Sequence, residues 1–366
     1  MSLKSNKLKV GISIGDPNGI GIEVILKTLQ NKEILEFFTP VIFASTKLMS
    51  YQKNVFGLNS MYFQGIFKPE EAIHGKINVV NLWKDNVSID FGKPTEEGTQ
   101  MAKSSLIAAV DALRQGSVDV LVTAPVNKEA MQTQDFKFLG HMDFLENKLD
   151  EKALMLLEND GLRIAIATYN IPLSEVPEKL SKELIKKQIK ALNNILIQDF
   201  RIEKPKIAVL GLNPHSGNNG LSGKEEIDFI EPAIKDCFEK KILAFGPYSA
   251  DSFFVPPSSL YSSFDGILAM YYDQGMIPFK ALAYEYGVNF SGGLSFIRTA
   301  PNHGTAYSIA GQGIAHEKSF EQAIFDAVKI YKTRKEYLEL KANALQKTKI
   351  EGIDIDEDLP LEEETE

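Results

Sequence analysis

The sequence contains a single cysteine, Cys237, so an internal disulfide bond is excluded. Because Cys237 lies in a segment with helical spacing, we expect a small packing residue rather than a nucleophile. No uninterrupted apolar run is long enough to span a bilayer, and the N-terminus carries no charged-then-apolar leader. We therefore expect a cytoplasmic protein that does not enter a membrane.

The chain also lacks a basic stripe and any base-stacking motif, so nucleic-acid binding has no support. Its net charge of −9 is concentrated at one end. Nine of the 49 acidic residues lie in 351–366, which holds no basic residue, and the rest of the chain balances 40 acidic against 40 basic residues. A block of like charge repels itself and cannot bury a core, so we expect residues 346–366 to form a mobile acidic tail.

What is present is the composition of a soluble globular protein, with 44% hydrophobic and 24% charged residues. A length of 366 residues fits two domains of ordinary size. Short apolar runs alternate with segments of helical spacing, and no repeat or low-complexity linker divides the chain. The predicted strands include 8–15, 39–45, 77–83 and 119–125, and the clearest predicted helix is 95–116. This alternation predicts an α/β fold with a largely parallel sheet covered on both faces.

Polar side chains follow the buried strand 119–125, in the motif VTAPVNK. The motif places Thr123, Asn127 and Lys128 where open α/β sheets bind ligands. Lys128 is a candidate for removing a substrate proton, provided that burial lowers its pKa. The alternative is an ordinary lysine near the first turn of the next helix.

A second concentration of reactive groups lies between residues 265 and 315. It includes two cations, Lys280 and Arg298, an amide, Asn289, and a histidine beside a glycine, His303 and Gly304. Fixed cations next to an amide suit an anion such as a phosphate monoester, because Arg presents a planar fork and Lys a point charge. Alternatively, the two cations are solvated surface charges.

Three consecutive blocks of this stretch, MYYDQGMIPFK, VNFSGGLSFIRT and NHGTAYSIAGQGIA, resemble the 4-hydroxythreonine-4-phosphate dehydrogenase (PdxA) family. Earlier blocks, from GISIGDPNGIGIE to GPYSADSFF, follow in the order of that family. The resemblance implies a two-domain α/β/α fold of the isocitrate/isopropylmalate dehydrogenase type, with a cleft between the domains. It predicts a discontinuous first domain, 1–130 plus 285–345, which carries the cofactor loop. The second domain, 131–284, would lie on the substrate and dimer side.

The resemblance also implies a reaction in pyridoxal 5'-phosphate biosynthesis. A nicotinamide cofactor would oxidise 4-phosphohydroxy-L-threonine to 2-amino-3-oxo-4-phosphooxybutanoate, which then loses carbon dioxide to give 3-amino-2-oxopropyl phosphate. A homodimer with a shared active site is expected. Two alternatives remain open, a dehydrogenase of a phosphorylated threonate or erythronate and a non-catalytic protein that binds a phosphorylated ligand.

By the same resemblance, Lys280, Asn289 and Arg298 would hold the substrate phosphate. His141 would contact the substrate, although Met142 stands where the family has a threonine. The adenosine side of the cofactor would lie on the loop residues His303, Gly304, Thr305, Ala306 and Ile309. Ser308 replaces an aspartate found in many relatives, so both NAD and NADP remain open. The turn GDPNGIG belongs to the cleft of the family, where Asp16 is either a cleft side chain or a carboxylate at a helix N-terminus.

The family resembles metal-assisted alcohol dehydrogenases, in which three histidines hold a divalent ion. This sequence keeps only His215, with Asn170 and Tyr272 at the other two positions. An amide is a weak ligand for a zinc-like ion, and a phenol must first lose a proton. Asp251, the second predicted catalytic residue after Lys128, and Asp273 are possible substitute ligands for a harder ion. Alternatively, Tyr272 donates a hydrogen bond to the substrate without a metal, or activity is lost.

Overall fold

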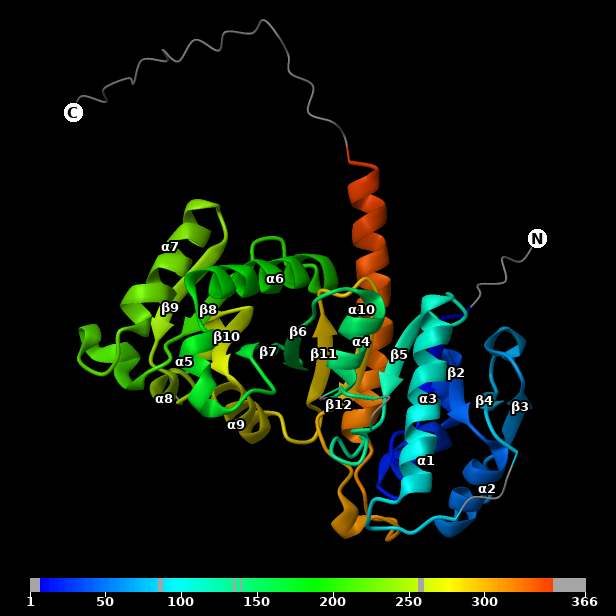
Figure 1. Cartoon of the computed structure of the whole chain (residues 1–366). Coiled ribbons are helices and arrows are strands. Elements are labelled where there is room, and N and C mark those ends of the chain that lie inside the picture. Colours follow the sequence, from blue (N-terminus) through cyan, green and yellow to red (C-terminus); the bar gives the residue numbers. More distant parts are fainter. Residues whose placement is uncertain (1–6, 85–87, 134–135, 139, 256–259, 345–366) are drawn as a thin grey trace, which may run out of the picture.

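The protein is described here as a computed structural model that covers residues 7–84, 88–133, 136–138, 140–255 and 260–344. The predicted acidic tail, 346–366, lies outside these residues. Within them, one 12-stranded sheet runs through the molecule in the order β3-β4-β2-β1-β5-β12-β11-β6-β7-β10-β8-β9. The sheet extends from β3 and β4 at one end to β8 and β9 at the other (Figure 1).

The N-terminal half of the sheet consists of parallel strands connected mainly by helices. Its strands are β1 (Lys9–Ser13), β2 (Thr39–Ala44), β3 (Phe63–Ile66), β4 (Ile77–Asn81) and β5 (Val120–Thr123). Its helices are α1 (Gly21–Gln30), α2 (Thr46–Val55) and α3 (Glu96–Arg114). α3 begins where the Thr95 side chain accepts a hydrogen bond from the Gly98 amide, as expected of an N-cap. The strands predicted at 8–15, 39–45, 77–83 and 119–125 are thus confirmed to within a few residues.

The other half also pairs parallel strands, β7 with β10, β10 with β8, and β8 with β9. The strands of this half are β6 (Leu154–Asn159), β7 (Leu162–Thr168), β8 (Lys206–Leu210), β9 (Leu243–Tyr248) and β10 (Gly266–Tyr271). Among them, β6 is antiparallel to its neighbour β7. The helices are α4 (His141–Leu149), α5 (Val176–Lys179), α6 (Lys182–Phe200), α7 (Glu231–Glu239), α8 (Ala250–Phe253) and α9 (Tyr272–Leu282). Cys237 is buried in α7, consistent with a packing role.

Two late strands connect the halves. β12 (Arg298–Pro301) pairs parallel with β5 and antiparallel with β11 (Val288–Gly292), which in turn pairs antiparallel with β6. The long helix α10 (Lys318–Ala342) packs beneath this junction. Residues 288–301 therefore place Asn289 and Arg298 between the two halves of the sheet, where side chains from both halves can contact one ligand.

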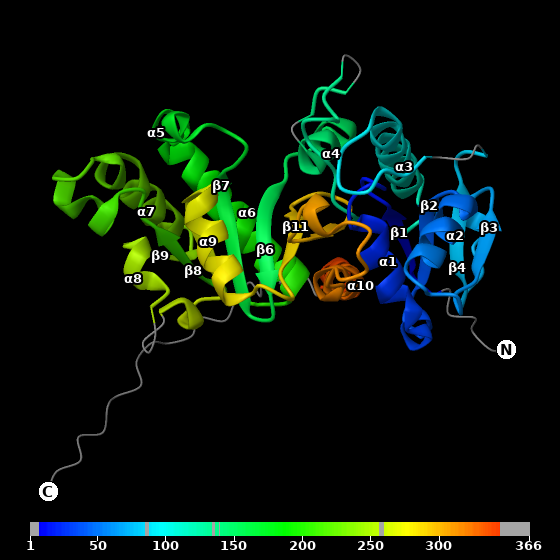
Figure 2. The same cartoon turned by 90° about the horizontal axis from the view of Figure 1, so that it is seen from below.

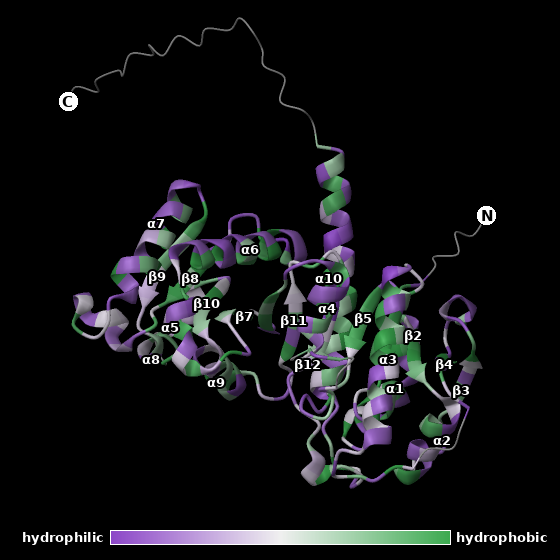
Figure 3. Ribbon diagram, viewed as in Figure 1, coloured by the Kyte–Doolittle hydropathy of each residue, from purple (hydrophilic) through white to green (hydrophobic). Residues whose placement is uncertain are grey.

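Helices cover both faces of the sheet. In Figure 2, α3 and α4 lie on one side of the strands, with α1 and α10 on the other. Two separate sets of buried apolar side chains match these faces, one including residues of α1, α6 and α10 and the other residues of α3 and α4. Figure 3 shows hydrophobic colour along β5 and mixed colours along α3 and α7, as expected for helices with one buried face. The predicted α/β fold with a largely parallel sheet is confirmed.

No helix that the structure describes is both long and apolar enough to cross a bilayer.

Candidate active site

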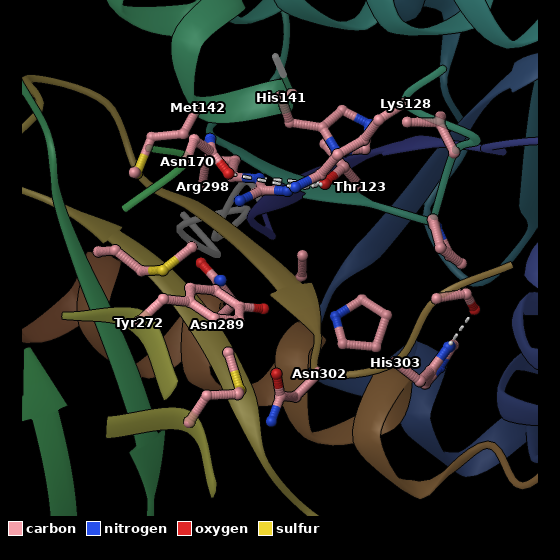
Figure 4. A pocket seen from close by; sticks show the side chains of 18 of the residues that line it. Thr123, Lys128, His141, Met142, Asn170, Tyr272, Asn289, Arg298, Asn302 and His303 are labelled. Atoms are coloured by element: carbon pink, nitrogen blue, oxygen red, sulfur yellow. Dashed lines mark hydrogen bonds between the residues drawn. The ribbon is translucent and has the colours of Figure 1, made fainter. Parts of the chain in front are cut away.

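A cavity of about 250 Å³ opens where the two halves of the sheet meet (Figure 4). Its walls come from segments that are distant in the sequence: the end of β5, the start of α4, the end of β7, α9, β11, β12 and the loop after β12. The predicted site residues that line it are Lys128, His141, Asn170, Tyr272, Lys280, Asn289, Arg298, His303 and Gly304. Other predicted site residues, namely Thr305, Ala306, Ile309, His215, Asp251 and Asp273, are not among its lining residues.

Arg298 is the most buried cation of this cavity, with only 5% of its surface exposed. Its Nε donates a hydrogen bond to Thr123 Oγ1 at 3.0 Å, Nη1 donates to Ser291 Oγ at 3.2 Å, and Nη2 also donates to Thr123 Oγ1. These are hydroxyl partners, and none of the lining residues is an aspartate or a glutamate. Burial lowers the pKa of Arg298 to about 9, so the guanidinium is still charged at neutral pH. A buried charge without a counterion is unfavourable, so the site favours an anionic ligand.

Two lysines add positive charge at the rim. Lys280, on α9, and Lys128, after β5, both line the cavity while part of each side chain stays exposed. Partial loss of hydration at the Lys128 amine, followed by repulsion from Arg298, lowers the pKa of Lys128. Its Nζ donates a long hydrogen bond of 3.4 Å to Asn170 Oδ1. Lys128 thus loses its proton more readily than an ordinary lysine does.

Three buried polar atoms of the cavity have no partner among the residues that the structure describes: His141 Nε2, Asn289 Oδ1 and His303 Nε2. Burial, together with the charges of Arg298 and Lys128, holds the pKa of His141 well below its usual range, so the ring is neutral at pH 7. Burial likewise lowers the pKa of His303. Each of these atoms belongs to a residue that lines the cavity, and a buried polar atom without a partner costs stability, so a ligand in the cavity would be a natural partner.

The loop 303–309 is attached to the turn after β1. The Ile20 amide donates to Thr305 O at 3.0 Å, and the Tyr307 hydroxyl donates to Asp16 Oδ2 at 2.6 Å. Asp16 is buried and also accepts from the Asn18 amide, so it fastens the loop rather than lining the cavity. Since α1 begins only at Gly21, the alternative role as a carboxylate in the first turn of the helix is wrong; Glu23 occupies that place.

The loop brings open backbone and a ring nitrogen without a partner to the edge of the cavity. A side chain added at Gly304 would meet nothing within 4 Å, so a ligand can approach the backbone closely there. His303 Nε2 is buried without a partner beside it. His303 and Gly304 therefore connect the loop to the cavity, whereas Thr305 contacts the turn at Gly19 and Ile20.

The three positions at which the resemblance implies metal ligands are separated in this chain. Asn170 and Tyr272 line the cavity, but His215 lies in the segment Pro214–Gly220, whose neighbour is Asp251 rather than the cavity. Burial raises the pKa of the Tyr272 phenol, which disfavours the phenolate that a metal would need. Within the described ranges, no three His, Cys, Asp or Glu side chains gather closely enough to hold an ion.

The two aspartates proposed as substitutes have other surroundings. Asp251 Oδ1 accepts a hydrogen bond of 2.6 Å from Ser249 Oγ, which together with His215 lowers the pKa of Asp251. Asp273 lines a neighbouring cavity of about 380 Å³ that shares Lys128, Asn170 and Tyr272 with the first. The residues present do not fit the divalent ion that the resemblance implies.

Sequence reasoning missed the residues that hold the site together. Ser291, Tyr307, Met276 and Asn302 lie within the blocks that resemble the family but were not predicted as site residues, and Met155 lies outside those blocks. Thr123 was predicted near the site because it lies at the end of a strand.

Comparison with known proteins identifies the family. The family model described as pyridoxal phosphate biosynthetic protein PdxA matches residues 36–327. The chain belongs to the PdxA family. A relative from Bacteroides thetaiotaomicron, a 4-hydroxythreonine-4-phosphate dehydrogenase, is 43% identical over 362 residues and covers 98% of this chain and 99% of its own. A relative of the same name from Sulfurihydrogenibium is 36% identical, covering 90% of this chain and 100% of its own.

Solved structures of PdxA relatives share the fold. The 4-hydroxythreonine-4-phosphate dehydrogenase of Klebsiella pneumoniae superposes with a TM-score of 0.73 at 30% identity, covering 90% of this chain and 99% of its own. The similarity therefore extends over both halves of the sheet.

Proposed function

We propose that this chain is a dehydrogenase that oxidises 4-phosphohydroxy-L-threonine at its secondary alcohol, within pyridoxal 5'-phosphate biosynthesis. The names of its PdxA relatives support the reaction. The observation that carries the assignment is the buried guanidinium of Arg298, which has hydroxyl partners but no carboxylate. A dianionic phosphate ester would supply the missing negative charge.

The phosphate would be held by Arg298, Lys280 and Asn289. All three line the same cavity although they come from β12, α9 and β11. Arg298 provides a planar fork, Lys280 a point charge at the rim, and Asn289 an amide. Holding the phosphate fixes the rest of the substrate, which converts the chemical step into one between positioned groups.

The hydroxyl of the substrate would meet Lys128 and the neutral ring of His141. As the alcohol becomes a ketone, its O–H proton passes to the Lys128 amine, whose pKa is lowered by burial and by the charge of Arg298. The hydrogen on the carbinol carbon leaves with its electron pair. Oxidised nicotinamide supplies the acceptor for that hydride when it is bound. The resulting β-keto acid then loses carbon dioxide to leave 3-amino-2-oxopropyl phosphate.

The cofactor would lie along His303, Gly304, Thr305, Ala306 and Ile309. Support comes from the open space at Gly304 and the unpaired Nε2 of His303. We propose NAD as the cofactor, with NADP as the alternative, because exposed Ser308 offers no carboxylate for a ribose hydroxyl.

We further propose that the chain works as a homodimer. α9 carries three exposed apolar or aromatic side chains near the cavity: Tyr272 at 39%, Ile277 at 65% and Leu282 at 44% exposure. Exposed side chains of this kind, on a helix that lines the ligand site, support an interface there. Light scattering of the purified protein gives the oligomeric state directly.

The deciding experiment measures nicotinamide reduction with 4-phosphohydroxy-L-threonine, and in parallel with phosphorylated threonate and erythronate. Preferred turnover of the first substrate supports the assignment, and preferred turnover of either hydroxy acid would replace it. Binding of all three esters with no turnover would identify a non-catalytic binding protein.

A further inference from the structure

The cavity places an amine where the resemblance implies a metal ion. Lys128 Nζ lies 3.4 Å from Asn170 Oδ1, and both side chains line the cavity together with Tyr272 (Figure 4). Asn170 follows the end of β7 and adopts a left-handed backbone conformation with φ of 54°. The amide oxygen that would have to bind an ion is thus already engaged by the Lys128 amine.

That contact disfavours a divalent ion for an electrostatic reason. An ion bound to Asn170 Oδ1 would have to displace Lys128 Nζ from that oxygen, and it would share the cavity with the buried guanidinium of Arg298, with no carboxylate among the lining residues. Like charges that share a cavity repel strongly wherever water is partly excluded. Whichever chain of a dimer contributes each position, moreover, the set remains one imidazole, one amide and one phenol.

We propose that this chain oxidises its substrate without a bound divalent metal ion, and that the Lys128 amine, positioned by the Asn170 amide, acts on the substrate hydroxyl in place of the metal. The proposal rests on the dehydrogenase function proposed above and deepens it. The balance of the step is complete: the O–H bond breaks with its proton going to Lys128 Nζ, and the C–H electron pair reduces oxidised nicotinamide. Tyr272 faces the same space and can donate a hydrogen bond to the oxygen as negative charge develops.

In this arrangement Lys128 is a catalytic residue and Asn170 a positioning residue. Removing the amine by Lys128→Met is expected to lower kcat about 10²–10⁴-fold, the range typical of a positioned proton acceptor. Asn170→Ala is expected to lower kcat by up to about 100-fold through misplacement of Lys128. It should leave KM for the phosphorylated substrate nearly unchanged, since Arg298, Lys280 and Asn289 still hold the phosphate. Asn170→Gln keeps the amide and should restore part of kcat.

The test uses the full chain and measures metal as well as activity. The protein is dialysed against EDTA, its metal content is determined by mass spectrometry, and turnover is measured with and without EDTA and with added magnesium, manganese or zinc. We expect no retained metal and the same kcat under every condition. Turnover that appears only with a metal would overturn the proposal while leaving the dehydrogenase function intact. If no condition gives turnover, both fail.

A gain-of-function variant provides the complementary measurement. Asn170→His combined with Tyr272→His places two imidazoles in the same cavity, and calorimetric titration should show tighter zinc binding than in the wild type. The matched control is Asn170→Gln combined with Tyr272→Phe, which alters the same positions without adding ligands and should bind no better than the wild type. Zinc binding by the wild type that is as tight as that of the histidine variant would overturn the proposal.

Discussion

Tyr307 donates a hydrogen bond of 2.6 Å to Asp16, a residue 291 positions earlier in the chain. This bond attaches the loop 303–309, which carries the proposed cofactor contacts, to the turn between β1 and α1. Because Asp16 is buried and its pKa is raised by burial, the Tyr307 hydroxyl is an important partner for its carboxyl group. The position of the loop 303–309 therefore depends in part on the Tyr307–Asp16 contact, which the local sequence around either residue does not predict.

Tyr307→Phe should release this loop. Loss of a hydrogen bond to a charged group costs about 1.5–3 kcal/mol, which corresponds to roughly 10–100-fold weaker cofactor binding. Substrate binding should change little, because Arg298 is held from β5 and β11. Tyr331→Phe is the matched control, since Tyr331 bonds Asp119 at 3.3 Å outside the cavity. Similar cofactor KM values in both variants would contradict the role of Tyr307.

Arg298→Ala should weaken substrate binding by about 1.5–3 kcal/mol, the value of a hydrogen bond to a charged group. The cofactor should be affected far less. Arg298→Lys should restore little, because an ammonium cannot reproduce the contacts to Thr123 and Ser291 and still offer a fork to phosphate. Dissociation constants from calorimetry for a phosphate ester and for NAD provide the comparison. Equal losses for the two ligands would count against a phosphate site at Arg298.

Glu158, on β6, shares a buried site with Asp326 of α10. Burial, followed by the hydrogen bond and charge of Asp326, raises the pKa of Glu158 to about 9. The folded protein thus keeps a proton that the unfolded chain releases near the ordinary pKa of about 4.3. The stability that this proton contributes is fully present below the unfolded pKa of about 4.3. It is lost as pH rises through the folded pKa of about 9.

Glu158→Gln is neutral at every pH, so it should lack this decline. Thermal melts of both proteins between mildly acidic and alkaline pH should show the wild type losing stability faster, with the variant more stable at the alkaline end. Parallel curves would mean that Glu158 titrates normally.

Arg334 of α10 forms a buried bidentate pair with Asp199 of α6, at 2.7 and 2.9 Å. Arg334→Ala leaves a buried carboxylate unpaired and should destabilise the fold by about 3–5 kcal/mol. Arg201→Ala is the control, because the Arg201–Glu336 pair is exposed and such pairs contribute about 0–1 kcal/mol. Urea unfolding compares the two variants. Comparable losses would show that burial of the Arg334 pair has no special effect.

The sequence by itself determined the strands, the largely parallel sheet and most of the groups that line the cavity. Apolar runs of strand length are recognisable without any tertiary information, and the ends of parallel strands lie at one edge of a sheet, so Thr123 and Lys128 could be placed near a ligand in advance. The block order from GISIGDPNGIGIE to NHGTAYSIAGQGIA led correctly to the PdxA family.

Only the tertiary structure decided which of those groups meet. β12 returns to lie beside β5, and this pairing brings Arg298 onto Thr123 across 175 residues. The same folding leaves His215 outside the cavity and sets Lys128 against Asn170. Local sequence encodes a strand or helix through spacing, but the partner of a side chain depends on strand order and register, which are set by the packing of the whole chain.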